Sequence, residues 1–254
     1  MKVDNKVAIV TGAGGGIGRA IAMKLASQGG QLVLVDLISQ GVDNVAQEIR
    51  QAGGTAVTHR ADVADERQVQ DCVAKVIADY GRLDMLVNNA GISPKKSNGS
   101  KAYLTEISLS EWENVMRVNL TSVFLMCGAS IPHMVSRGSG SIVNISSSAA
   151  LDGGILAAAH YSASKGAVSA LTRTLSKEMA PHGIRVNAVA PGRVATAMAK
   201  LSSNERNQAA LSRIPLGRFA EPQEIADSVA YLLSDQASYI TGVTLNVSGG
   251  YVVN

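Results

Sequence analysis

The chain has 254 residues, of which 46% are hydrophobic, only 4% aromatic and 17% charged. These proportions predict a folded α/β protein with an aliphatic core, and they exclude a disordered chain. The formal net charge is +3 and the basic residues form no long run, so the sequence predicts no nucleic-acid surface and no polybasic membrane patch.

The N-terminal ten residues pass directly into an apolar strand pattern and lack the features of a signal peptide. No uninterrupted apolar run reaches the length of a membrane span, so we expect a cytoplasmic protein without one. Cys72 and Cys127 have neither CxxC spacing nor a neighbouring histidine. We interpret both as buried thiols in a reducing compartment, and we expect no metal site.

Short β-branched runs alternate with helical patterns from the start of the chain. Strands are expected at 6–12, 31–36, 55–63 and 83–91. The helices predicted between them cover 16–30, 41–54 and 65–81, the last with Asp65 as N-cap. This order of elements is typical of a parallel sheet.

A glycine-rich turn, "TGAGGGIG", joins the first strand to the first helix. Gly12 permits a tight turn, Gly16 permits close approach of a pyrophosphate, and Gly18 permits close packing of helix on strand. The helix N-terminus then presents N–H groups to phosphates. The turn therefore predicts a dinucleotide site.

Asp36 ends the second strand, where an acid can bond both hydroxyls of the adenine-side ribose and repel a 2′-phosphate. No Lys or Arg occurs at 12–18 or 37–38 to hold such a phosphate. We therefore expect NAD(H) as the cofactor rather than NADP(H). The alternative interpretation is that Asp36 only caps the strand.

The alternation continues to the end of the chain. A helix begins at Ser108, which has capping-box spacing to Glu111, and runs to about 135. The remaining expected elements are strands at 140–147, 184–192 and 242–250, and helices at 161–180 and 221–235, the last with Pro222 near its first position. Together these elements predict one Rossmann-type domain over 1–254, a doubly wound parallel sheet of about seven strands with helices on both faces.

Two long loops follow predicted strands, at 92–108 and 193–219. Ligands bind at this edge of a doubly wound sheet, and we expect 193–219 to close over the substrate. The basic stretch 94–101 is interpreted as a solvated loop, with contact to an acidic group as the alternative. Arg193 is a further candidate for contact with an anion at the cofactor end.

Tyr161 and Lys165 are four residues apart on one predicted helix, so they share a face. A free tyrosine titrates near pH ~10, and a nearby ammonium group favours its phenolate. Such a tyrosine can exchange a proton with an alcohol or a carbonyl, while a serine hydroxyl holds the substrate oxygen. The alternative interpretation is a surface pair without a catalytic role.

The sequence resembles the short-chain dehydrogenase/reductase family over almost its full length. The resemblance rests on six segments: "TGAGGGIG", "ADV" (61–63), "NNAG" (88–91), "VNL" (118–120), "YSASK" (161–165), and "RVNAVAPG" followed by Thr196. It implies an oxidoreductase that exchanges a hydride between the cofactor and a secondary alcohol or ketone.

The resemblance also implies roles for individual residues. Tyr161 would be the acid/base, Lys165 would lower its pKa and bind the nicotinamide ribose, and Asn119 would hold a water in a proton relay. For Asn119 and Asn89 a purely structural role is the alternative. The cofactor-binding residues would be Gly12, Gly16, Ile17, Gly18, Asp36, Asp62, Val63, Asn89, Gly91, Tyr161, Lys165, Pro191, Gly192, Val194 and Thr196.

The catalytic serine is ambiguous in the run "NISSS". Counting back from Tyr161 by the spacing usual in the family gives Ser148, whereas the end of the strand gives Ser147. A strand end is rigid and the following Gly/Ala-rich loop can absorb an insertion. We therefore prefer Ser147 and keep Ser148 as the alternative.

Two other functions remain open from sequence alone. A 3-oxoacyl-acyl-carrier-protein reductase shares this fold and site, although Asp36 disfavours the NADPH that such enzymes usually take. A non-catalytic nucleotide-binding protein is the other, although such relatives usually lose the Tyr, Lys or Ser. The resemblance further implies a homo-oligomer, usually a tetramer, with a small-molecule alcohol or ketone as substrate.

Overall fold

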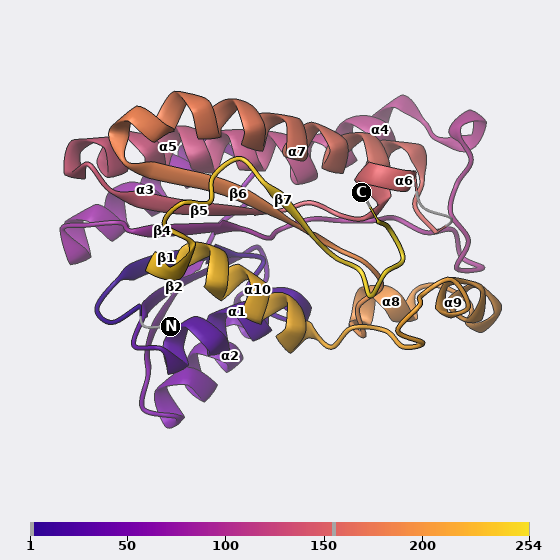
Figure 1. Cartoon of the computed structure of the whole chain (residues 1–254), viewed down its shortest axis with the longest axis horizontal. Coiled ribbons are helices and arrows are strands. Elements are labelled where there is room, and N and C mark those ends of the chain that lie inside the picture. Colours follow the sequence, from indigo (N-terminus) through magenta and orange to yellow (C-terminus); the bar gives the residue numbers. More distant parts are fainter. Residues whose placement is uncertain (1–2, 154–155, 254) are drawn as a thin grey trace.

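Seven parallel strands form one sheet, in the order β3-β2-β1-β4-β5-β6-β7 (Figure 1). The computed structural model describes residues 3–153 and 156–253. The strands are β1 (Val7–Thr11), β2 (Gln31–Asp36), β3 (Thr55–Arg60), β4 (Met85–Asn88), β5 (Gly140–Ile145), β6 (Ile184–Pro191) and β7 (Thr244–Val247). The predicted fold class is confirmed.

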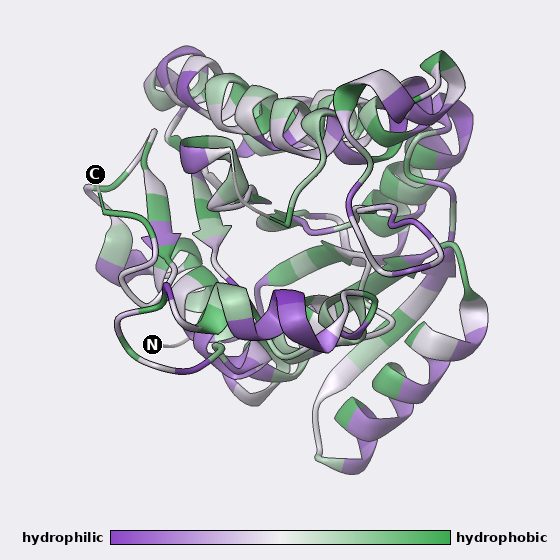
Figure 2. Ribbon diagram, turned by 90° about the vertical axis from the view of Figure 1, so that its right-hand side faces the viewer, coloured by the Kyte–Doolittle hydropathy of each residue, from purple (hydrophilic) through white to green (hydrophobic). Residues whose placement is uncertain are grey.

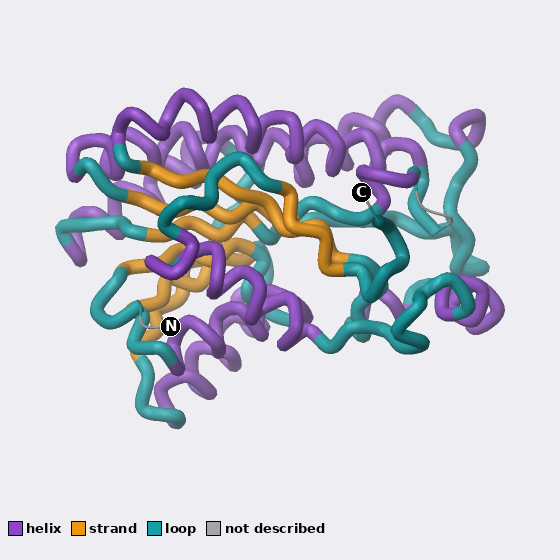
Figure 3. The backbone as a smooth tube through the Cα atoms, viewed as in Figure 1, coloured by secondary structure: helices purple, strands orange, loops and turns teal. Residues whose placement is uncertain are grey.

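Helices cover both faces of the sheet in two layers (Figures 1 and 3). One layer consists of α1 (Gly16–Ser27), α2 (Ser39–Gln51) and α10 (Pro222–Leu233). The other consists of α3 (Glu66–Tyr80), α5 (Ser122–Arg137) and α7 (Ala159–Met179). Because the sheet is covered on both sides, its central strands β1, β2 and β4 are mostly apolar, and green is prominent on strands in Figure 2, whereas the edge strand β3 is largely polar and exposed.

The strands divide their side chains between two cores. In β1, Ala8 and Val10 pack toward the layer of α1, α2 and α10, whereas Val7 and Ile9 pack toward the other layer. This alternation is the period of two that a strand imposes. Both predicted thiols, Cys72 and Cys127, are buried, and neither forms a disulfide.

The N-terminal residues predicted for three helices are confirmed. Asp65 caps α3 by accepting a hydrogen bond from the Gln68 N–H at 3.0 Å. Ser108 caps α4 (Leu109–Met116) by accepting one from the Glu111 N–H at 3.1 Å. Helix α10 begins at Pro222, whose missing N–H costs nothing at this position.

The long helix predicted from Ser108 is interrupted. A π-helical turn, Arg117–Thr121, separates α4 from α5. Single π turns of this kind insert into α-helices and recur at functional sites, and this one contains Asn119. A regular helix was the wrong prediction here, because periodicity alone does not reveal one extra residue in a turn.

The whole helical stretch Leu109–Arg137 is long and apolar enough to cross a membrane by length and composition alone. In this fold its second part, α5, lies against the sheet and α3, and Met126, Cys127 and Met134 are buried in the core. Burial of this kind accounts for the hydropathy of a helix inside a globular α/β fold.

Short helices occupy the connections: η1 (Leu104–Glu106), α6 (Ala149–Asp152), η3 (Ala180–His182), α8 (Ala197–Lys200), α9 (Asn204–Leu211) and η4 (Asp235–Ala237). Of the Gly/Ala-rich bend before α7, residues 154–155 lie outside the described residues. The two long loops touch: a Cβ on Gly99 would lie 2.8 Å from the Leu201 carbonyl oxygen. A bridge between Val194 and Ala220 closes the base of the second loop.

Candidate active site

A cavity of about 620 Å³ opens at the carboxyl ends of the strands. It lies where the strand order reverses between β1 and β4, the place where doubly wound sheets bind ligands. All the predicted cofactor and catalytic residues line this cavity except Gly18 and Asn119. The sequence therefore identified one contiguous site.

The glycine turn after β1 leaves no room for side chains. Gly12 has φ +62°, and a Cβ there would lie 2.8 Å from the Ala90 Cα. A Cβ on Gly18 would lie 2.0 Å from the Gly12 carbonyl oxygen. The N-cap of α1, Gly15, offers no side chain to the first turn, so the helix N-terminus retains N–H groups for an anion.

Asp36 helps to hold this turn while it faces the cavity. One carboxylate oxygen accepts a hydrogen bond from the Gly14 N–H at 3.0 Å and the other from the Ile38 N–H at 3.3 Å. Parallel pairing also sets Arg60 beside Asp36 in the sheet, a neighbour that the positions next to Asp36 in the sequence do not reveal. Arg60 donates to the Leu37 carbonyl oxygen and does not line the cavity.

Asp62 and Val63 line the same end of the cavity as Asp36. Burial acts to raise the pKa of Asp62, but hydrogen bonds from Arg117 and the Ala64 N–H hold that pKa below its usual value. The Arg117 guanidinium lies 2.8 Å from the Asp62 carboxylate. Arg117, the cation at this end of the cavity, therefore already forms an ion pair with Asp62.

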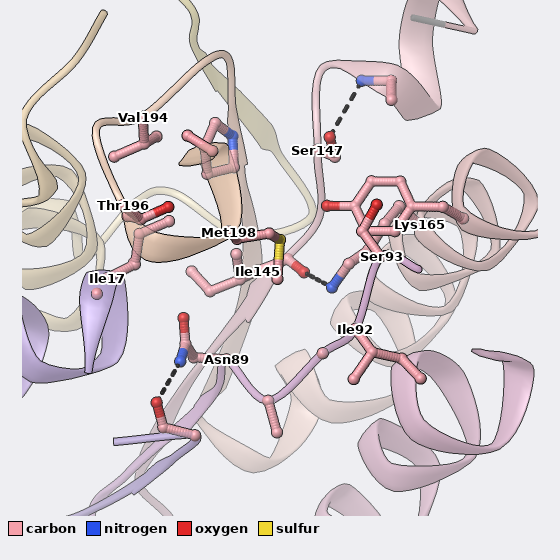
Figure 4. A pocket seen from close by; sticks show the side chains of 18 of the residues that line it. Ile17, Asn89, Ile92, Ser93, Ile145, Ser147, Lys165, Val194, Thr196 and Met198 are labelled. Carbon is pink, nitrogen blue, oxygen red and sulfur yellow. Dashed lines mark hydrogen bonds between the residues drawn. The ribbon is translucent and has the colours of Figure 1, made fainter. Parts of the chain in front are cut away.

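Asn89 links the end of β4 to the glycine turn. Its side-chain amide donates to the carbonyl oxygens of Thr11 at 3.0 Å and Gly12 at 2.9 Å. It also lines the cavity, and Figure 4 shows it at the cavity floor. Asn89 therefore has the structural role that was the alternative to a direct cofactor contact.

Asn119 is fully buried in the π turn. Its side-chain oxygen accepts from the Ile92 N–H at 2.7 Å, and its amide donates to the Ile92 carbonyl at 3.0 Å and to the Ser164 hydroxyl at 3.1 Å. These bonds position the chain after β4. A Cβ on Gly91 would lie 3.2 Å from the Asn119 oxygen and 3.3 Å from the Lys165 Nζ, so these three residues meet.

Three serines follow β5, which ends at Ile145 and not at 147 as predicted, and their side chains face different ways. Ser146 turns inward and bonds the Lys165 carbonyl at 2.9 Å and the Ser169 hydroxyl at 2.8 Å. Ser147 lines the cavity and forms a side-chain hydrogen bond with Tyr161. Ser148 begins the turn into α6 without capping it by its side chain. The geometry thus pairs Tyr161 with Ser147, the serine preferred from the sequence, two residues beyond the end of β5.

Tyr161 is in an unusual electrostatic environment. Burial raises its pKa, whereas the Ser147 hydrogen bond and the positive charge of Arg193 lower it. Lys165, expected to act on Tyr161, instead donates from Nζ to the Ile145 carbonyl at 2.7 Å (Figure 4). Burial lowers the pKa of Lys165 to about 8. The sequence did not assign Arg193 this influence on Tyr161, because the two are far apart in the chain.

Lys95 also departs from the expectation of a solvated loop. It is half-buried, lines the cavity and donates from Nζ to the Leu156 carbonyl oxygen. His160, next to Tyr161, is fully buried and its Nε2 lies 2.9 Å from a Glu111 carboxylate oxygen. Among the described residues, no three His, Cys, Asp or Glu side chains gather as metal ligands.

Residues 12–252 match a family model described as enoyl-(acyl carrier protein) reductase. The chain is 38% identical over 253 residues to the 3-oxoacyl-(acyl-carrier-protein) reductase of Thermotoga maritima, covering 100% of both. It is 42% identical over 247 residues to the cis-4-hydroxycyclohexanecarboxylate dehydrogenase of Sinomonas cyclohexanicum, covering 97% of this chain and 96% of that one.

A solved structure of a 3-oxoacyl-(acyl-carrier protein) reductase with bound NAD, from Brucella melitensis, superposes with a TM-score of 0.92. It is 37% identical and covers 99% of this chain and 93% of that chain. Matches of this extent, together with a cavity that unites the glycine turn, Ser147, Tyr161 and Lys165, confirm the resemblance. The chain belongs to the short-chain dehydrogenase/reductase family and is an oxidoreductase of that family.

Proposed function

We propose that this protein catalyses the NAD(H)-dependent interconversion of a secondary alcohol and a ketone, with Tyr161 as the acid/base. The observation that carries the proposal is the hydrogen bond between Ser147 and Tyr161 inside the cavity that begins at the glycine turn. A proton donor and an oxygen-binding hydroxyl are thereby held within reach of one substrate oxygen.

The nicotinamide ring, when bound, accepts or donates the hydride. The residues of the chain handle the proton and the geometry. Ser147 binds the substrate oxygen, and Tyr161 removes the alcohol proton during oxidation or supplies one to the carbonyl during reduction. Burial works against the phenolate of Tyr161, and the charge of Arg193 opposes that effect. Lys165, fixed on the Ile145 carbonyl, holds a second cation at the same end of the cavity.

The site suits a dinucleotide on two counts. The glycine turn would be filled by any added Cβ at Gly12 or Gly18, and the α1 N-terminus is without a side-chain cap. Asp36 supports NAD(H) over NADP(H), because its carboxylate faces the cavity and forms no ion pair with a described residue. The remaining proposed cofactor contacts, from Asp62 to Thr196, border the cavity along its length (Figure 4 labels part of this wall).

The direct experiment is a substrate screen with the purified enzyme. NADH formation from NAD is followed at alkaline pH with a panel of secondary alcohols, and NADH consumption at neutral pH with the matching ketones. We expect turnover that Tyr161→Phe abolishes while the Kd for NAD stays unchanged. Tight NAD binding without turnover on any member of the panel would instead indicate a non-catalytic nucleotide-binding protein.

A second candidate is reduction of a 3-oxoacyl thioester, which the relatives from Thermotoga maritima and Brucella melitensis carry in their names. Initial rates on an acetoacetyl thioester with NADH and with NADPH separate the two candidates. An efficient NADPH-dependent reduction would favour the thioester reductase. Failure with NADPH, alongside NAD-dependent oxidation of simple alcohols, would favour the alcohol dehydrogenase.

We further propose that the segment 193–219 closes over the substrate, because Met198 and Ile214 from this segment line the cavity. The homo-oligomer implied by the family resemblance stays a prediction, and size-exclusion chromatography with light scattering tests it.

A further inference from the structure

The carboxylates that line the cavity are confined to one end, where Arg117 pairs with Asp62. The lining carboxylates belong to Asp36 and Asp62, which follow β2 and β3 at the adenine end. Lys95 and Arg193 come from the two long loops, after β4 and β6, and both line the cavity; the charge of Arg193 acts on Lys95 and on Tyr161. Among the described lining residues, the end of the cavity with Tyr161 therefore has cations and no carboxylate.

Lys95 is held in a position that disfavours a positive charge. Its Nζ donates to the carbonyl oxygen of Leu156, in the bend that leads from the serines to α7. Burial, together with the nearby charges of Arg193, Lys101 and Arg206, lowers the pKa of Lys95 to about 8. An anion placed here would relieve both the repulsion and the lost hydration.

Arg193 is fixed but incompletely bonded. One terminal nitrogen donates to the Ala199 carbonyl oxygen at 2.8 Å and to the Asn207 side-chain oxygen at 2.5 Å. Its Nε is buried and has no hydrogen-bond partner among the described residues. The contrast is with Arg185, whose terminal nitrogens are bonded to four backbone carbonyls. Buried donors are normally satisfied, so the free Nε indicates a missing acceptor.

The pyrophosphate of a dinucleotide does not account for this pair of cations. That group belongs at the glycine turn and the α1 N-terminus, where Gly16 lies against the Thr196 side chain. Lys95 instead contacts the bend at Leu156, beyond the serines, and the charge of Arg193 acts on Tyr161. The anion that these cations would bind is therefore on the substrate side.

Building on the proposed dehydrogenase function, we propose that Lys95 and Arg193 form a binding site for a carboxylate of the substrate, so that the enzyme takes hydroxy acids and oxo acids in preference to neutral alcohols and ketones. A guanidinium and an ammonium group both form charge-assisted hydrogen bonds to carboxylates, so the two side chains suit one carboxylate. The surrounding wall contains Ile92, Leu156, Met198 and Ile214, which suits an acid with a small hydrocarbon body.

The test compares oxo acids with their methyl esters, which lack the negative charge and carry one additional methyl group. Acetoacetate, 4-oxopentanoate and 4-oxocyclohexanecarboxylate are each paired with the ester, and kcat/KM is measured with NADH. We expect at least one acid to exceed its ester about tenfold or more. Lys95→Met should remove that preference through KM, with kcat nearly unchanged, and Lys95→Glu should favour the ester.

Lys96→Met is the matched control. Lys96 adjoins Lys95 in sequence but forms an ion pair with Glu106 and does not line the cavity. We expect it to keep the wild-type preference. Equal use of all three acids and their esters by the wild type would overturn the proposal, and so would a preference that survives in Lys95→Met. In either case turnover itself leaves the proposed dehydrogenase function standing.

A binding measurement separates failure of the two proposals. If none of the six compounds is reduced, the dehydrogenase proposal fails for this substrate class, and calorimetry on the NADH-saturated enzyme then decides the carboxylate site. Binding of an acid, but not of its ester, that is lost in Lys95→Met supports the site. Equal binding of acid and ester, or none, overturns it.

Discussion

Replacing Asp36 by Asn should change the cofactor preference by a predictable amount. Asn keeps an oxygen that accepts from the Gly14 N–H, so the turn should survive, but it removes the negative charge. A 2′-phosphate bound beside position 36 would place charges about 5 Å apart, where one unit pair contributes about 1.7 kcal/mol at a dielectric constant of about 40. A phosphate charge of about −2 raises this repulsion to about 3 kcal/mol.

The same substitution weakens the charge-assisted hydrogen bond to the ribose hydroxyls of NAD by about 1 kcal/mol. The sum of about 4 kcal/mol corresponds to about a thousandfold fall in the ratio of kcat/KM with NAD to kcat/KM with NADP. Initial rates at varied cofactor concentration measure this ratio, or calorimetric Kd values do so without turnover. Arg60→Ala is the control, since Arg60 adjoins Asp36 in the sheet but lies outside the cavity lining. A wild type that prefers NADP, or an Asp36→Asn ratio within tenfold of wild type, would refute the reasoning.

Three further outcomes are expected. Ser147→Ala should lower kcat about 100-fold or more without changing the Kd for NAD, whereas Ser148→Ala should stay within a few fold, because Ser147 alone bonds Tyr161; equal losses would contradict the assignment. Gly18→Ala should lower the free energy of unfolding, measured in urea, by about 2 kcal/mol or more, because its Cβ would meet the Gly12 carbonyl oxygen. Gly128→Ala, at an exposed position of α5 with open space around it, should raise that free energy by about 0.5–1 kcal/mol. Burial lowers the pKa of Lys165 to about 8 against 10.5 unfolded, so above pH 8 the unfolded chain binds more protons and this residue's contribution to stability rises toward pH 10. The Tm of wild type minus the Tm of Lys165→Met should therefore become more positive over that window, and a constant value would exclude such a shift.

The elements of the sheet were predictable because parallel strands buried on both faces are read directly as apolar runs bounded by glycines. Ser147 was preferred over Ser148 as the end of the strand, but β5 ends at Ile145 and the Ser148 N–H also bonds β6, at the Pro191 carbonyl oxygen, so it is the contact with Tyr161 that distinguishes Ser147. Caps such as Asp65 depend only on neighbours in the chain, and they too were found.

Other features depend on contacts between distant segments, and no local pattern encodes them. The π turn at Asn119 looks like ordinary helix in the sequence. The charge of Arg193 lowers the pKa of Tyr161, and Arg60 lies beside Asp36 because β2 pairs with β3. Lys95 was read as solvated because a basic, polar stretch usually is, whereas packing of the two long loops against each other half-buries it.

The bridge at the base of the 193–219 segment has an evolutionary consequence. The Ala195 N–H donates to the Ala220 carbonyl oxygen, and the Ala220 N–H donates to the Arg193 carbonyl oxygen, each at 2.9 Å. The two ends of the segment are thus tied to each other, whatever lies between them. Doubling the length of such a loop costs only about 0.6 kcal/mol in closure entropy. Insertions, deletions and exchanges in this segment can therefore accumulate without endangering the sheet, so a lineage can acquire new substrates while it inherits the hydride chemistry unchanged.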